Sequence, residues 1–297
     1  MKEKSYDELD FTDDFLFCKI MMENEDLCIE MAEMITGRQI KTLVCTEDQK
    51  TIRLTRNGKG VRFDVYFEDD ENVIYDIEMQ ATKKKDLPKR TRYYQGMIDL
   101  NILTRGDTYK LLRESYIIFI CTFDEFGKGR HKYSFENICL EDAEVKLEDG
   151  SHKIFLCAAG TMDDCSEKMK DFLDYIAGGT RSGVLSDRLR EEVEKSKTKE
   201  KWRLDYMTLQ EKYREKYDEG REEGREEGRE EGRKEGKTDL LISLVCKKLR
   251  KGKSIPQIAD ELEADEIRIQ AICQEAEKFA PDYDEEKVLK AVQAAVV

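Results

Sequence analysis

Two short stretches in which apolar and polar residues alternate constrain the fold of this chain more than any other feature. The first reads VRFDVYF from Val61 to Phe67, and the second reads NVIYDIEMQ from Asn72 to Gln80. Alternation of this kind is typical of strands, because successive side chains of a strand point to opposite faces. The connection between them, Glu68 to Asn72, is turn-like and too short for a crossover helix. The sequence therefore predicts an antiparallel hairpin.

The polar residues of this hairpin share one face. In the second strand that face carries Asp76, Glu78 and Gln80, and Asp64 of the first strand is expected near Asp76 or Glu78. Carboxylates held this close repel each other, and a cation commonly neutralises such a cluster. Hard oxygen ligands suit Mg²⁺ or Mn²⁺. The competing interpretation places these acids on the solvated side of a sheet, since 66 of the 297 residues are Asp or Glu.

A basic stretch follows the hairpin in a chain that is acidic overall. The formal net charge of −14 gives no general attraction to DNA or anionic lipid, so contact with nucleic acid requires a local patch. The patch after Gln80 contains Lys83, Lys84, Lys85, Lys89, Arg90 and Arg92. These cations are placed to meet a backbone phosphate, although a solvated run of charge explains them equally well.

Composition favours a soluble protein of the reducing cytoplasm. The nine cysteines are scattered and form no CxxC pair, which suits small buried hydrophobic residues. The first ten residues lack a signal-type apolar stretch, and no apolar run reaches membrane-spanning length, so we expect no membrane association. Neither His131 nor His152 has a partner at metal-ligand spacing, which argues against a zinc site and against histidine-based nucleophilic catalysis.

The first part of the chain, 1–180, has the pattern of an α/β domain. We expect a helix over Phe11–Ile35, with Thr12 as its N-cap, and Gly37 ends it. A second helix over Arg90–Leu103 precedes the unbroken apolar run Tyr116–Phe123, which is typical of a strand covered on both faces. Strand, helix and strand in this order predict a crossover unit.

The remainder is rich in charge and in helix-forming residues. Segment 181–219 is expected to be an amphipathic helix whose apolar stripe packs on its own core or pairs with a second copy of the chain. The glycine-punctuated repeat GREE in 220–237 predicts a spacer or a partly helical stalk. In 238–297, Ser254 and Gln257 form a capping box at a helix-turn-helix spacing. A structural helical hairpin is favoured there, because the second helix presents few DNA-reading residues.

Several segments, in order, connect the chain to a known family. They are FTDDFLFCKIM near the start, VRFDVYF and VIYDIEMQ, KRTRYYQGMIDLNILTRGDTY, YIIFICTF, and the charged tail with its glycine repeat. Together they resemble the bacterial Rpn recombination-promoting nucleases, also described as PD-(D/E)XK nuclease family transposases. The resemblance implies a restriction-endonuclease-like core, in which helices flank a mixed central sheet, and divalent-metal-dependent cleavage of DNA.

The resemblance also implies roles for individual residues. Asp64 matches the first acid of the family signature, Glu78 the second acid, and Gln80 the position that lysine usually holds in the wider superfamily. Asp14 looks like the additional acid of the first helix, with its neighbour Asp13 as the alternative. Glutamine is usual in this subgroup, but it cannot supply the positive charge of lysine.

The chemistry of these residues can be reasoned independently. Asp64 and Glu78, with the main-chain carbonyl of Met79, would hold Mg²⁺ or Mn²⁺, which lowers the pKa of a bound water and neutralises the charge of phosphodiester hydrolysis. The resemblance adds Asp14 to these metal ligands. Gln80 can orient that water by hydrogen bonding, and a second metal or a nearby lysine would compensate for the missing charge. The candidates for contact with DNA are Lys83, Lys85, Arg92 and Tyr94. Tyr94 could equally be a packing residue.

Three functional hypotheses follow. The first is a metal-dependent DNA endonuclease that promotes recombination and is associated with mobile elements. The second is a catalytically silent, oligomeric DNA-associated or regulatory protein that acts through its helical tail. The third is a helical scaffold in which the N-terminal domain only terminates a stalk.

Overall fold

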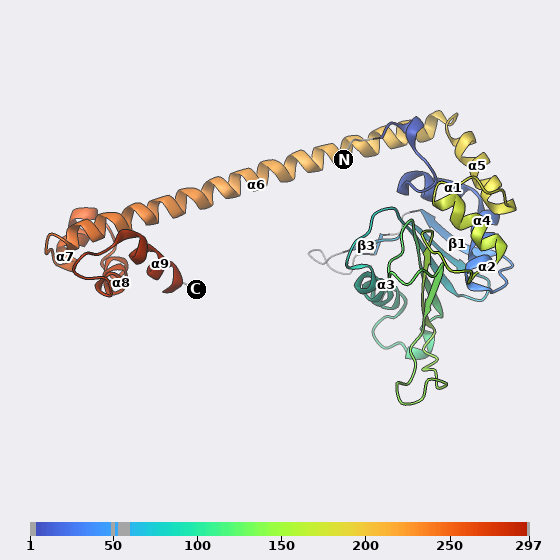
Figure 1. The fold of residues 1–297 in the computed structure, drawn as a ribbon, viewed down its shortest axis with the longest axis horizontal. Coiled ribbons are helices and arrows are strands. Elements are labelled where there is room, and N and C mark those ends of the chain that lie inside the picture. The colour runs from blue at the N-terminus through green and yellow to red at the C-terminus, as the bar shows by residue number, and fades with distance from the viewer. Residues whose placement is uncertain (1–3, 49–50, 53–59, 296–297) are drawn as a thin grey trace. The chain divides into compact units, whose positions relative to one another are not determined.

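The computed structural model describes residues 4–48, 51–52 and 60–295. The chain divides into two compact units, Met1–Thr208 and Leu209–Val297, and each is described by itself (Figure 1). None of the described helices has the length and apolar character that a membrane span requires.

The first unit is built around a six-stranded mixed sheet in the order β1-β4-β5-β6-β8-β7. The three central strands β5, β6 and β8 are parallel, and the outer pairs are antiparallel. The strands are β1 Leu43–Asp48, β4 Val65–Asp69, β5 Ile74–Gln80, β6 Ser115–Cys121, β7 Lys132–Phe135 and β8 Ser151–Cys157. This architecture confirms the predicted α/β fold with a mixed central sheet.

The predicted crossover unit is present. Helix α3, Leu87–Ile102, connects β5 to β6, which pair in parallel from Ile74 opposite Ser115 onward. The helix begins three residues earlier than predicted because Pro88 occupies its first turn, where the missing N–H of proline costs no hydrogen bond.

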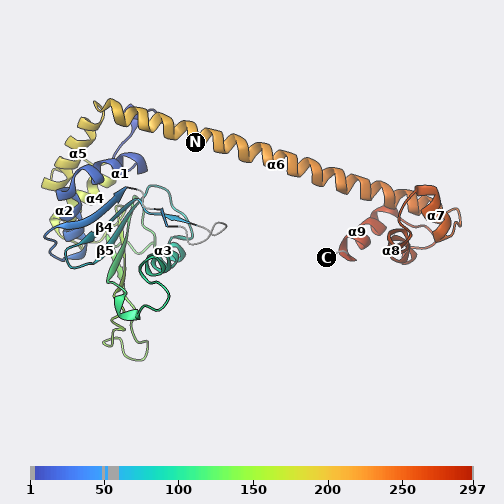
Figure 2. The same ribbon diagram turned by 180° about the vertical axis from the view of Figure 1, so that it is seen from behind.

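Helices cover both faces of the sheet. Helix α3 lies on one face, and the other face carries a second helical layer (Figures 1 and 2). That layer consists of α1 Asp14–Glu23, α2 Glu25–Thr36, α4 Glu167–Ile176 and α5 Val184–Ser196. All seven residues of β5 are consequently buried. The interpretation that the acids of this strand face solvent is therefore wrong.

The predicted strand Val61–Phe67 is not continuous. Val61–Arg62 forms β3, which pairs with β2, Thr51–Ile52, in a separate two-stranded sheet. The chain then bends at Phe63 and Asp64 before β4 begins. Phe63 and Tyr66 consequently pack in the same core under α3, which the strict alternation of one strand would not allow.

The first predicted helix is also interrupted. Asn24 has non-helical dihedral angles and separates α1 from α2, and its side-chain amide donates to the carbonyl of Ile20 at 2.8 Å. Asp13, not Thr12, is the N-cap of α1. Gly37 ends α2 as predicted, in the left-handed conformation (φ 77°) that favours glycine.

The second unit contains most of α6, Glu200–Leu249, and three shorter helices. Helix α6 is continuous through the GREE repeat, so the segment predicted as a spacer or partly helical stalk is fully helical here. The C-terminal end of α6 packs on α7 Ile255–Leu262, α8 Glu266–Glu277 and α9 Glu285–Ala295. The capping box of Ser254 and Gln257 is present at the start of α7. Two elements that the sequence did not predict are β7 and α9.

Candidate active site

Two hydrogen bonds connect Asp64 to neighbouring residues of β5, one to the side chain of Glu78 and one to the backbone of Met79. The backbone N–H of Asp64 donates to Glu78 Oε1 at 3.0 Å, and the backbone N–H of Met79 donates to Asp64 Oδ2 at 3.3 Å. The bend before β4 makes this possible, because it frees the Asp64 backbone from the sheet and turns its side chain toward β5. The structure thus brings the two predicted acids together at the edge of one face.

Both acids, Asp64 and Glu78, are buried. The exposed fraction is 6% for Asp64 and 1% for Glu78. Burial, followed by repulsion from Asp14, raises the pKa of Asp64 to about 7. Burial, followed by repulsion from Asp64, raises the pKa of Glu78 to about 8. Each shift reflects the cost of keeping an ionised carboxylate in a medium of low dielectric constant beside another one.

Asp76 adds a third carboxyl group to this face. It is fully buried, and neither of its carboxyl oxygens has a hydrogen-bonding partner among the described residues. Burial and the neighbouring charges of Glu78 and Asp64 raise its pKa well above the ordinary value. The sequence placed Asp76 correctly on the face shared with Glu78, but the hydrogen bonds of Asp64 go to Glu78 and to the backbone of Met79.

Arg90 is the cation that meets these acids. From α3 its Nη2 donates to Glu78 Oε2 at 3.2 Å and to the hydroxyl of Tyr94 at 2.6 Å, and its Nη1 donates to Gln80 Oε1 at 3.1 Å. The sequence counted Arg90 only as a member of the basic stretch and missed this role. No local pattern could reveal it, because Arg90 and Glu78 meet only after α3 packs on the sheet.

Asp14 differs from the buried acids in its exposure. It is the first residue of α1 and its side chain is exposed, yet its charge raises the pKa of both Asp64 and Glu78, so it lies near them. The alternative, Asp13, is engaged elsewhere: it pairs with Lys4 at 2.7 Å and accepts from the backbone of Asp10 at 2.8 Å. The electrostatics favour Asp14 as the helix acid.

The donor set fits a hard divalent cation, since it consists of carboxylate oxygens with more negative charge than Arg90 can balance. Asp14, Asp64 and Glu78 do not, however, bring one oxygen each within 4.8 Å of one another. Like charges repel, and Arg90 already holds one oxygen of Glu78. Binding of one cation by all three acids therefore requires rotation of side chains.

A different group of possible metal ligands lies elsewhere. His131, Asp164 and Cys165 place one ligand atom each within 4.8 Å, and no other such group occurs among the residues that the structure describes. The expectation that neither histidine has such partners was wrong for His131, because residues 33 positions apart in the sequence meet here. His131 Nδ1 lies 3.1 Å from Asp164 Oδ1, an ordinary hydrogen-bonding distance.

The four candidates for contact with DNA differ in their surroundings. Lys85 and Arg92 are exposed. Lys83 donates to the backbone carbonyls of Asp124 at 2.8 Å and Glu125 at 3.1 Å, so its ammonium group is engaged by these two carbonyls. Tyr94 is buried, and its hydroxyl contacts Arg90 and Glu78. It packs beside the acids, which agrees with the alternative of a packing residue.

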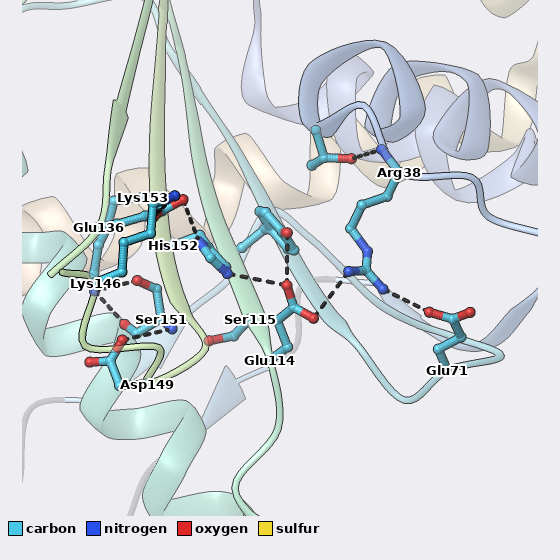
Figure 3. A network of polar contacts seen from close by, with 12 residues as sticks. Arg38, Glu71, Glu114, Ser115, Glu136, Lys146, Asp149, Ser151, His152 and Lys153 are labelled. Atoms are coloured by element: carbon cyan, nitrogen blue, oxygen red, sulfur yellow. Dashed lines mark hydrogen bonds and ion pairs between the residues drawn. The ribbon is translucent and has the colours of Figure 1, made fainter. Parts of the chain in front are cut away.

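A second polar network occupies the opposite end of the parallel strands (Figure 3). Glu114, directly before β6, accepts from His152 Nε2 at 3.1 Å and from Arg38 Nη1 at 3.1 Å, and Arg38 Nη2 reaches Glu71 at 2.8 Å. The ring of His152 also stacks on Tyr116 with a centroid distance of 4.5 Å. His152 therefore has a structural role, connecting neighbouring strands far from the acids.

A mixed sheet with a β-α-β crossover, carrying two acids and a glutamine at one end, defines a restriction-endonuclease-like nuclease. The chain matches the family described as PD-(D/E)XK nuclease family transposase over residues 10–225. This match covers more than half of the chain, so the protein belongs to that family, as the sequence resemblance predicted. No significant match was found among curated proteins or solved structures.

Proposed function

We propose that this protein is a metal-dependent DNA endonuclease of the cytoplasm that hydrolyses phosphodiester bonds and promotes DNA recombination, in association with mobile elements. The observation that carries the proposal is the close approach of two buried acids, in which Asp64 is hydrogen-bonded to the side chain of Glu78 and to the backbone of Met79. A buried pair of acids costs stability unless positive charge neutralises it, and a bound divalent cation would supply that charge.

Each residue has a distinct task in this proposal. Asp64, Glu78, Asp14 and the main-chain carbonyl of Met79 would hold Mg²⁺ or Mn²⁺, which acts as a Lewis acid and activates water when it is bound. Gln80, fixed by Arg90, orients the attacking water. The guanidinium of Arg90 donates to a phosphate oxygen and takes the place of the superfamily lysine as the fixed positive charge near the reacting phosphate.

The test is cleavage of supercoiled plasmid by the full-length protein. We expect nicked and linear products with Mg²⁺ or Mn²⁺, none with EDTA, and a loss of at least about 100-fold in Asp64→Ala and Glu78→Gln. Asp218→Ala removes an exposed acid from α6 and is the matched control, which should cleave like wild type. Equal cleavage by Asp64→Ala and Asp218→Ala would remove the assignment of the site.

The second candidate, an oligomeric and catalytically silent DNA-associated or regulatory protein, draws on a different observation. Helix α6 exposes the large apolar side chains of Leu204, Met207 and Tyr217, which could pair with a second copy of the chain. Sedimentation of the full-length protein measures this self-association. DNA binding without turnover under either metal would decide for this function.

A further inference from the structure

A groove of about 660 Å³ lies between α3 and β3, directly beside the acids. We propose that this groove, the α3 groove, binds an unpaired nucleotide next to the phosphate that is cleaved, so that the preferred substrate is DNA with single-stranded character. The inference rests on the proposed nuclease function and specifies the substrate of the same site.

The wall of the groove on α3 is one continuous helix face. Each of its residues has another one three or four positions away, which places them together on one side of an α-helix. They are Lys89, Arg92, Tyr93, Gly96, Met97 and Leu100. The opposite wall comes from β3 and includes Arg62. This side is thus a single surface along which an extended ligand can lie.

This surface combines two kinds of chemistry. Four cations, Arg62, Lys89, Arg90 and Arg92, line the groove against one acid, Asp86, in a chain whose net charge is −14. This positive charge matches the phosphates of a nucleic acid. Tyr93 and Leu100 add aromatic and apolar surface, with exposed fractions of 41% and 59%. Cations alone would be enough to bind the phosphates. An aromatic and apolar surface beside them is typical of sites that stack a base.

Gly96 keeps the groove open. It lies inside α3, where glycine costs about 1 kcal/mol relative to alanine. A Cβ atom built on Gly96 meets nothing within 4 Å, so neither packing nor backbone geometry requires glycine there. A side chain at this position would project into the groove. The absence of a side chain therefore provides space for a ligand.

The groove continues into the candidate active site. Arg90 and Tyr94 line the groove and also contact Glu78, so a strand whose phosphate lies at the acids passes directly into it. In a duplex the faces of the bases are covered by their stacked neighbours. Only an unpaired or extruded base can place its face on Tyr93 and Leu100.

The experiment is fluorescence anisotropy with the full-length protein in EDTA, which prevents hydrolysis of the probe. Labelled single-stranded DNA and the duplex of the same sequence are titrated against wild type, Gly96→Leu and Leu100→Glu. We expect wild type to bind the single strand more tightly, and both variants to lose about 10-fold of this affinity while duplex binding changes less than about 2-fold. Gly228→Leu is the matched control, since Gly228 is also helical and a Cβ there also meets nothing within 4 Å.

Leu100→Glu is expected to fold like wild type, because Leu100 is exposed and glutamate is a good helix former. A loss of affinity in this variant is therefore not explained by misfolding. The inference is overturned if wild type binds the duplex as tightly as the single strand, if both folded variants bind like Gly228→Leu, or if they lose affinity for both probes equally. Failure of the proposed function is a separate result, because it appears as plasmid cleavage that does not depend on Asp64.

Discussion

Replacement of Asp64 by asparagine should stabilise the protein in the absence of metal. Burial raises the pKa of Asp64 from the ordinary 3.8 to about 7, so the folded state holds a proton more tightly than the unfolded state. The stability that this proton contributes is complete below about pH 4 and is lost as the pH rises through about 7. Asparagine does not titrate, and it can still accept the hydrogen bond from the N–H of Met79.

The magnitude follows from the same values. A pKa difference of about 3 corresponds to about 4 kcal/mol at a pH above both values. Arg90 remains nearby in the variant, and we therefore expect Asp64→Asn to be more stable by up to about 4 kcal/mol at pH 8 and by much less at pH 4.5. Added Mg²⁺ should narrow the difference, since it binds the wild-type acids and stabilises the folded state by mass action.

Urea denaturation followed by circular dichroism measures these free energies of unfolding, in EDTA and in excess Mg²⁺, across this pH range. Asp218→Asn is the matched control and should follow wild type at every pH, because Asp218 is exposed. A variant no more stable than wild type at pH 8, or a difference that persists unchanged at pH 4.5, would refute the reasoning.

Three further substitutions test other parts of the structure. Arg90→Gln should destabilise the metal-free protein by about 3 kcal/mol at pH 8, because it leaves buried Glu78 without its cation. Urea denaturation at pH 8 and pH 5 should show a smaller loss of stability at the lower pH. Trp202→Ala removes a buried ring whose Nε1–H donates to Glu23 at 3.0 Å, and it should cost about 3 kcal/mol, visible as a lower midpoint in urea. Gly37→Ala forces a left-handed residue to carry a Cβ atom and should cost about 1 kcal/mol in the same assay, whereas no loss would show that the helix end adapts.

The features predictable from the sequence are those that local periodicity or capping determines. The shared face of Asp76, Glu78 and Gln80 follows from the two-residue period of a strand, and all three occur together on β5. The crossover through α3 follows from the order of the elements. The end of α2 at Gly37 follows from the left-handed conformation that glycine adopts readily.

The features that the sequence could not predict depend on tertiary packing. The bend at Asp64 is invisible in an alternating pattern, because a broken strand and a continuous one have the same residues. Arg90 reaches Glu78 only because α3 folds back over β5. His131 and Asp164 are separated by two strands, β7 and β8, and by the loops that follow them. In each case the decisive contact joins residues that no local signal relates.

The bend at Phe63 and Asp64 has a consequence for how this protein can change over evolution. In an uninterrupted strand, inserting or deleting one residue would invert every side chain that follows and move the acids to the wrong side of the sheet. Here β3 pairs outside the main sheet, and the irregular residues before β4 can absorb such a change. The ribbon of β2 and β3 can therefore vary in length among descendants while the positions of Asp64 and Glu78 stay fixed.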